Sequence, residues 1–123
     1  MKQVFVHGLG QVPAAWEATL SRLGDGEERV CPGLAELLCG READYKNLYG
    51  GFSDFCGRLW RIRCPVLVLC GSRDRANRKA SIELAGLLKN AGFQVVAGAG
   101  HEINTEAPEA LAERLRAFYK GLG

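Results

Sequence analysis

The feature that most constrains the fold is the apolar run Pro65–Cys70, which contains no charged or polar side chain apart from the thiol. A strand that is apolar on both faces is typical of a parallel sheet covered by helices on both sides. The next segment, Asn77–Ala91, has leucines on one side at helical spacing, and we expect Gly92 to end that helix. Phe93–Ala97 is then predicted as another strand. A strand, a helix and a second strand in this order indicate an α/β fold.

The same alternation extends over the rest of the chain. The other predicted elements are a strand over Gln3–His7, a helix that Pro13 opens, a weak strand over Glu28–Cys31, a helix over Tyr45–Leu59 and a helix over Pro108–Leu122. The helix over Tyr45–Leu59 contains Gly50 and Gly51, which each cost about 1 kcal/mol relative to alanine. The order predicts one domain, residues 1–123, built as a three-layer, doubly wound, mainly parallel sheet of four strands.

Length and charge argue against several functional classes. The chain has 123 residues, of which 47% are hydrophobic and 24% charged, which is ordinary for one globular domain. The formal net charge is +2 and the basic residues are scattered, so we expect no nucleic-acid partner. No apolar run has the length of a membrane span, so we expect no membrane partner. The start of the sequence lacks the pattern of a secretory signal, and the predicted location is the cytoplasm.

The cysteines favour neither a disulfide framework nor a metal site. They number five, and no C-x-x-C pair occurs among them. Zinc sites and disulfide scaffolds require closer, paired spacing. We expect instead reduced thiols that are mostly buried as small apolar side chains. The sequence therefore predicts no metal and no other cofactor.

A glycine-rich turn follows the first predicted strand. Its residues are His7-Gly8-Leu9-Gly10-Gln11, and the glycines allow a ligand to approach the backbone closely. A dinucleotide-binding fingerprint would need a third glycine at position 13, where the chain has proline. Two interpretations stay open, namely a turn that contacts a ligand and an ordinary connection from strand to helix.

Two titratable residues follow the later strands. Asp74 ends the sequence C-G-S-R-D just after one strand, and His101 ends the sequence G-A-G-H just after the next. Each has an ordinary explanation, since acids are common at helix starts and a single histidine is more often structural. Because ligand sites of open parallel sheets lie at the carboxyl ends of the strands, we expect Asp74 and His101 to lie close together there.

Together these motifs resemble the α/β-hydrolase superfamily. Its members carry an H-G turn, an acid after one strand and a histidine after a later strand. The resemblance covers nearly the whole chain in two blocks, residues 1–59 and 60–123. It implies a minimal α/β-hydrolase-like core.

The resemblance also implies a role for each motif. His101 would be the general base, and Asp74 would hold its ring in the required tautomer. Gly8, Leu9 and Gly10 would bind the oxyanion or ligand through the N–H of Leu9 or Gly10. The implied ligand is a small acyl or ester-like molecule.

The sequence departs from the family in one respect. The G-x-S-x-G motif that presents the nucleophile occurs nowhere, and residues 60–63 lead directly from the preceding helix to the strand before Asp74. Ser72 is a candidate surrogate nucleophile, because it lies in the loop before Asp74. Ser53 is predicted to lie in the middle of a helix, and Cys70 is expected to be buried and inert.

The missing segment affects both topology and function. Its loss should bring the first strand beside the strand over Pro65–Cys70, which gives the strand order 2-1-3-4. Three functions stay open. The first is a family member, an ester or acyl hydrolase by ancestry, that keeps acid, base and part of the oxyanion hole and is weakly active or inactive. The second is an active hydrolase with a surrogate nucleophile or a water activated by His101. The third is a non-catalytic module that binds a small ligand or a partner.

The shortened core also predicts an assembly. Loss of central elements leaves apolar surface without its former cover, and such patches usually find a partner. The short join near Trp60 favours exchange of elements between protomers. We therefore expect a homodimer. One form of it is a domain-swapped dimer, in which residues 1–59 of one protomer pack against residues 60–123 of the other. A closed four-stranded monomer is the alternative.

Overall fold

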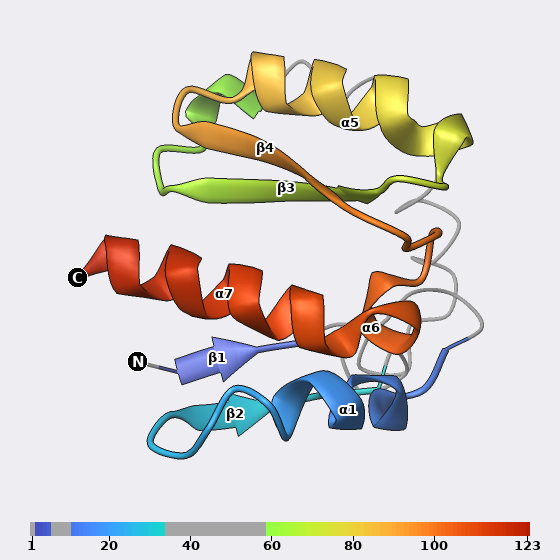
Figure 1. Cartoon of the computed structure of the whole chain (residues 1–123). Coiled ribbons are helices and arrows are strands. Elements are labelled where there is room, and N and C mark those ends of the chain that lie inside the picture. The colour runs from blue at the N-terminus through green and yellow to red at the C-terminus, as the bar shows by residue number, and fades with distance from the viewer. Residues whose placement is uncertain (1, 6–10, 34–58) are drawn as a thin grey trace.

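The computed structural model describes residues 2–5, 11–33 and 59–123. Their order is that of an α/β chain (Figure 1). The strands are β1 (Lys2–Val4), β2 (Glu28–Val30), β3 (Val66–Gly71) and β4 (Ala91–Val96). The helices are α1 (Glu17–Leu20), α5 (Arg75–Leu87), α6 (Ile103–Glu106) and α7 (Pro108–Leu122), and short 3₁₀ helices cover Pro13–Trp16 and Leu59–Arg61.

The strands pair in parallel, as the sequence predicts. β1 pairs with β2 from Lys2 opposite Glu28 to Val4 opposite Val30. β3 pairs with β4 over a longer ladder, and its register begins with Val66 opposite Ala91. Within the described residues these are two separate two-stranded sheets. An α/β architecture with parallel pairing is thus confirmed, whereas a single sheet in the order 2-1-3-4 is not shown.

The helices cover the two strand pairs differently. In Figure 1, α5 lies along the outer side of β3 and β4, and α7 lies on the opposite side of that pair, toward β1 and β2. α5 contacts both β3 and β4, and α7 contacts α1. The guanidinium of Arg116 on α7 donates to the carbonyl of Arg22, just after α1. α7 therefore joins the first part of the chain to the last.

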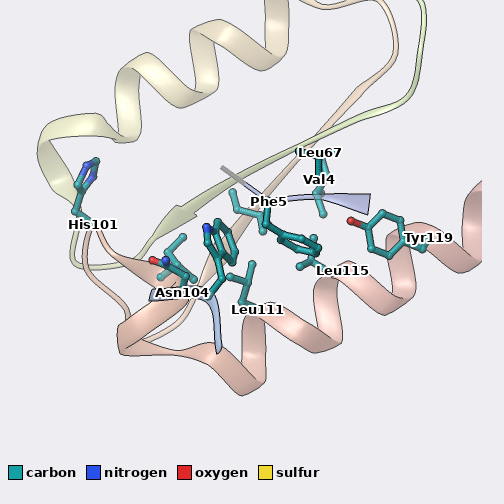
Figure 2. A pocket seen from close by; sticks show the side chains of 11 residues that line it. Val4, Phe5, Leu67, His101, Asn104, Leu111, Leu115 and Tyr119 are labelled. Atoms are coloured by element: carbon teal, nitrogen blue, oxygen red, sulfur yellow. The ribbon is translucent and has the colours of Figure 1, made fainter. Parts of the chain in front are cut away.

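The apolar core lies between these layers but does not fill the space completely. Val68 and Cys70 of β3, Val96 of β4 and Leu111 of α7 are buried. A cavity of about 380 Å³ lies between β1, β3 and α7. Figure 2 shows Phe5, Leu111 and Leu115 along this cavity, with His101 toward one end and Tyr119 toward the other. The cavity connects the interior with the loop that carries His101.

The predicted end of the helix before β4 is wrong. α5 ends at Leu87, and Leu88 is already extended with ψ of 139°. Gly92 does not end the helix but lies within β4, opposite Leu67 of β3. The ladder is the physical reason, because pairing with β3 satisfies the backbone groups of residues 91–96 and outweighs the local preference of glycine to end a helix. α7, in contrast, spans Pro108–Leu122 as predicted.

Several other predictions fall partly or wholly outside the described residues. These are the end of the strand over Gln3–His7, the turn Gly8-Leu9-Gly10, Ser53, Cys39, Cys56 and nearly all of the helix over Tyr45–Leu59. Of the cysteines that are described, Cys31, Cys64 and Cys70 are free thiols. Cys70 is buried as expected, but Cys64 is exposed. Among the described helices, none combines the length and the apolar character that a membrane crossing requires.

Candidate active site

The candidate site is built from the two loops that follow β3 and β4. Because these strands are parallel neighbours, both loops leave the same edge of the sheet. The amide of Ser72 donates to the carbonyl of Val96 at 2.9 Å, and the amide of Arg73 donates to the carbonyl of Ala99 at 2.9 Å. The ladder thus continues beyond the strands, and the backbone of one loop is bonded to that of the other.

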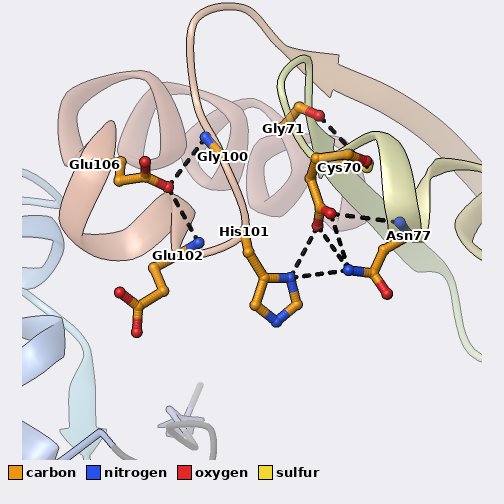
Figure 3. Close-up of polar contacts among 8 residues, drawn as sticks. Cys70, Gly71, Asn77, Gly100, His101, Glu102 and Glu106 are labelled. Carbon is orange, nitrogen blue, oxygen red and sulfur yellow. Dashed lines mark hydrogen bonds and ion pairs between the residues drawn. The ribbon is translucent and has the colours of Figure 1, made fainter.

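Asp74 and His101 meet where the two loops end. His101 Nδ1 lies 2.8 Å from Asp74 Oδ2 (Figure 3). The His101 side chain is 76% exposed, whereas only 10% of the Asp74 side chain is exposed. An ionised carboxylate can only accept, so Nδ1 donates in this contact. In the neutral ring with this tautomer Nε2 holds the lone pair. That form of the pair has the arrangement of a general base.

Asn77 is the second partner of Asp74. Its Nδ2 group donates to Asp74 Oδ1 at 2.9 Å and to Oδ2 at 3.1 Å, and its backbone amide donates to Oδ1 at 3.3 Å. Asp74 thereby caps the N-terminus of α5. The hydrogen bonds from His101 and then from Asn77 lower the pKa of Asp74 below its ordinary value of 3.8. Asp74 is accordingly ionised at neutral pH.

A second carboxylate, Glu106, holds the backbone on both sides of His101. Its Oε2 atom accepts from the amide of Gly100 at 3.0 Å and from the amide of Glu102 at 3.2 Å. Its Oε1 atom pairs with Arg73 Nη2 at 3.4 Å. Glu106 therefore fixes the position of the histidine backbone and links it to the loop of Asp74.

Gly71 allows the two loops to approach each other. A Cβ atom at this position would lie 2.1 Å from the carbonyl oxygen of Gly100 and 2.3 Å from that of Ala99. Both atoms belong to the backbone, so a larger residue at position 71 would force the loops apart. The close contact of the loops, and with it the short distance between Asp74 and His101, depends on this glycine.

A polar network connects the histidine loop to the first part of the chain. Gln11 Nε2 donates to Glu102 Oε1 at 3.0 Å and to Asn104 Oδ1 at 3.3 Å. Asn104 is buried, and its Nδ2 group donates to the carbonyl of Ala15 at 3.3 Å. Gln11 directly follows the turn Gly8-Leu9-Gly10 in the sequence. The turn itself lies outside the described residues, so its role as oxyanion donor stays a prediction.

Ser72, the predicted surrogate nucleophile, makes different contacts. Its Oγ atom accepts from the amide of Gly98 at 2.8 Å, and its carbonyl accepts from Arg78 Nη2 at 2.9 Å. Within the described residues no hydrogen bond joins Ser72 to His101. The structure thus brings Asp74 and His101 together and places the Ser72 hydroxyl against the opposite loop.

Three residues of the site, Asn77, Glu106 and Asn104, were not predicted from the sequence. The helix α5 was predicted to begin at Asn77, but it begins at Arg75. With the correct start, the D-x-x-N pattern from Asp74 to Asn77 indicates a capping pair. Glu106 and Asn104 acquire their roles only when the loops fold together. In the part of the chain that is described, no cluster of three or more His, Cys, Asp or Glu side chains could hold a metal ion.

Comparisons with known proteins support the fold. No protein-family profile matches the sequence, and no curated protein is significantly similar to it. The structure is similar to that of a protein from Thermoplasma acidophilum described as a predicted CIB-like hydrolase. The TM-score is 0.72 at 15% sequence identity, and the alignment covers 98% of this chain and 86% of that chain. At this identity the similarity establishes the fold alone, and the chain therefore has a hydrolase-like fold.

Proposed function

We propose that this chain is an α/β-hydrolase-type protein that acts weakly on small acyl esters, with His101 as general base and Asp74 as its orienting acid. The observation that carries the proposal is the 2.8 Å contact between His101 Nδ1 and Asp74 Oδ2, with the ring exposed and the acid covered. This geometry leaves Nε2 free to accept a proton from a water molecule. Aspartate stabilises the imidazolium that results.

The reaction follows from these two groups. Water attacks the ester carbonyl while Nε2 of His101 takes one of its protons, and the imidazolium then protonates the departing alkoxide. The products are a carboxylic acid and an alcohol. Because no G-x-S-x-G motif presents a serine, the rate is limited to what general-base catalysis contributes, about 10²–10⁴-fold.

The proposal is tested with an activated ester such as p-nitrophenyl acetate. We expect slow turnover that falls about 100-fold in His101→Ala, because the general base is lost. Added imidazole should partly restore the rate of that variant. Asp74→Asn should also be slower, whereas Asp25→Asn, at an exposed position in the loop before β2, should not. Equal rates for His101→Ala and the unmodified protein would refute the proposal.

A second function is favoured by the cavity between β1, β3 and α7, whose volume of about 380 Å³ lies within the range of ligand pockets. On this alternative, the chain binds a small ligand without turnover.

A surrogate nucleophile at Ser72 has less support, because the Ser72 hydroxyl already accepts a hydrogen bond from the amide of Gly98. Fluorophosphonate labelling tests for a serine nucleophile. If the protein is labelled and Ser72→Ala abolishes the labelling, Ser72 is the nucleophile of a serine enzyme.

A further inference from the structure

The side-chain amide of Asn77 touches both members of the acid–base pair. Its Nδ2 atom lies 2.9 Å from Asp74 Oδ1, 3.1 Å from Asp74 Oδ2 and 3.3 Å from His101 Nδ1 (Figure 3). Among the described residues, no other side chain has a hydrogen-bond contact with both members of the pair. Asn77 is thus placed to act on the pair from outside it.

The direction of these contacts follows from the charge of Asp74. An ionised carboxylate only accepts, so Asn77 Nδ2 and His101 Nδ1 both donate to it. The amide must present its nitrogen to Asp74, because its oxygen would be repelled there. The two nitrogens lie 3.3 Å apart and share Asp74 Oδ2 as their acceptor. Two donors therefore converge on the oxygen that faces the histidine.

The amide restricts how the carboxylate can turn. A carboxylate that is bonded only to an imidazole can rotate about its last torsion, which is broad and roughly two-fold. In this site Asn77 Nδ2 contacts both oxygens, and the backbone amide of Asn77 donates to Oδ1 at 3.3 Å. Oδ1 is thereby kept at the start of α5, and Oδ2 is left for His101. Asn77 fixes which oxygen the ring meets.

Asn77 also affects the proton between acid and base. Hydrogen bonds to a carboxylate favour its ionised form. In agreement, the bonds from His101 and then from Asn77 lower the pKa of Asp74. An imidazolium formed in the reaction therefore keeps its Nδ1 proton, since Asp74 is too weak a base to take it, and gives its Nε2 proton to the leaving group.

We propose that Asn77 is a positioning residue for the acid–base pair, and that its side-chain amide holds Asp74 Oδ2 against His101 Nδ1 during turnover. This role rests on the proposed function for its catalytic meaning, and it adds a residue to the two that the proposed function requires. It is separate from the capping of α5, which uses the backbone amide of Asn77. Removal of the side chain therefore tests the positioning role while the cap is kept.

The first measurement needs no turnover. In Asn77→Ala, the pKa of the Asp74 carboxyl, followed by ¹³C NMR, should rise toward its ordinary value of 3.8. The ¹⁵N signals of the neutral His101 ring should show a larger share of the second tautomer. The chain has two histidines, and the signals that are missing from His101→Ala identify this ring. Asn90→Ala, at an exposed position in the turn before β4, should leave both readouts unchanged.

The second measurement is the hydrolysis of p-nitrophenyl acetate. Asn77→Ala should lower kcat about tenfold, which corresponds to one ordinary hydrogen bond, and leave KM unchanged. Asn77→Asp has the same shape but accepts where asparagine donates, so it should repel Asp74 and lower kcat further. Asn77→Gln keeps the donor and should recover part of the rate. A role in packing alone would rank Asn77→Asp above Asn77→Ala. Far-ultraviolet circular dichroism checks that each variant is folded.

Each outcome has a distinct meaning. An unchanged pKa of Asp74 together with unchanged His101 ring signals in Asn77→Ala would overturn the inference. So would a raised KM with unchanged kcat, because Asn77 would then contact the substrate, in the cavity of about 300 Å³ that it lines with Asp74 and His101. If the NMR signals respond as expected but the unmodified protein hydrolyses no ester, the proposed function fails and the positioning of the pair stands. If Asn77→Ala keeps the full rate and His101→Ala does not, only the inference fails.

Discussion

The two strand pairs of this protein differ in how firmly they are built. β3 and β4 pair over six residues each, and the bonding continues into the loops through Ser72 and Arg73. β1 and β2 pair over three residues each, followed by one bond from the amide of Phe5 to the carbonyl of Val30 at 2.9 Å. The acid and the base belong to the longer ladder, and the predicted oxyanion turn follows the shorter one. The site thus depends on how well the shorter pair is anchored to the longer.

The largest effect should come from a substitution that pushes the two loops of the longer ladder apart. Gly71→Val should destabilise the protein by about 3 kcal/mol, because any Cβ there would collide with the backbone oxygens of Ala99 and Gly100. Urea denaturation measures this. Gly92→Ala in the same ladder is the control, since a Cβ at that position meets nothing within 4 Å. Similar losses in both variants would show that the close approach of the loops is unimportant.

A smaller effect should follow when the link between the two pairs is cut. Asn104→Ala removes the hydrogen bonds to Gln11 and Ala15 from a buried position, and should cost about 2 kcal/mol. If the link positions the first part of the chain, amide hydrogen exchange should become faster in β1 and β2 and stay slow in β3 and β4. Thr105→Ala, at the neighbouring exposed position, should alter neither. Uniform faster exchange in all four strands would contradict this division.

Glu106 provides a test within the longer pair. Glu106→Gln weakens the hold on the amides of Gly100 and Glu102 and removes the ion pair with Arg73, which should cost about 1 kcal/mol. The ¹⁵N signals of the His101 ring should then show a larger share of the second tautomer, because the ring is no longer held against Asp74. Glu109→Gln, in the first turn of α7 and exposed, should leave both stability and tautomer unchanged. A Glu106 variant with unaltered ring signals would limit this residue to a structural role.

The subtlest test concerns pH. Asp74 has a pKa below its ordinary value of 3.8 in the folded protein, because His101 and Asn77 donate to it. The carboxylate therefore contributes stability that is present above that ordinary value and is lost as the pH falls through the lower pKa of the folded state. The difference in unfolding midpoint between the unmodified protein and Asp74→Asn should accordingly shrink from pH 6 to pH 2.5. The same comparison for Asp25→Asn should show no comparable trend.

The sequence predicted best those elements whose signals are local. Pro108 and the apolar spacing after it define α7 correctly, because proline fits the first turn of a helix and the apolar face is continuous. The predicted end of α5 was wrong, because Gly92 pairs with Leu67 in the sheet. This pairing is non-local, and the tendency of glycine to end helices does not take it into account. At the site, the contact between Asp74 and His101 follows from parallel topology and was predicted. Asn104 bonds to Gln11 and Glu106 to Arg73, which are far away in the sequence, and Glu106 also holds the amide of Gly100 in the loop between β4 and α6. No pattern in the sequence predicts these contacts.

The double use of Asp74 has an evolutionary consequence. Its carboxylate caps α5 through the amide of Asn77 as well as holding the ring of His101. Selection for a stable helix would preserve this acid even where selection for catalysis is relaxed. Within the described residues, His101 has an exposed ring and caps no helix, so it would be the first of the two to change. A lineage of such chains that keeps the aspartate and varies the histidine would have lost the chemistry, and one that keeps both would still be using it.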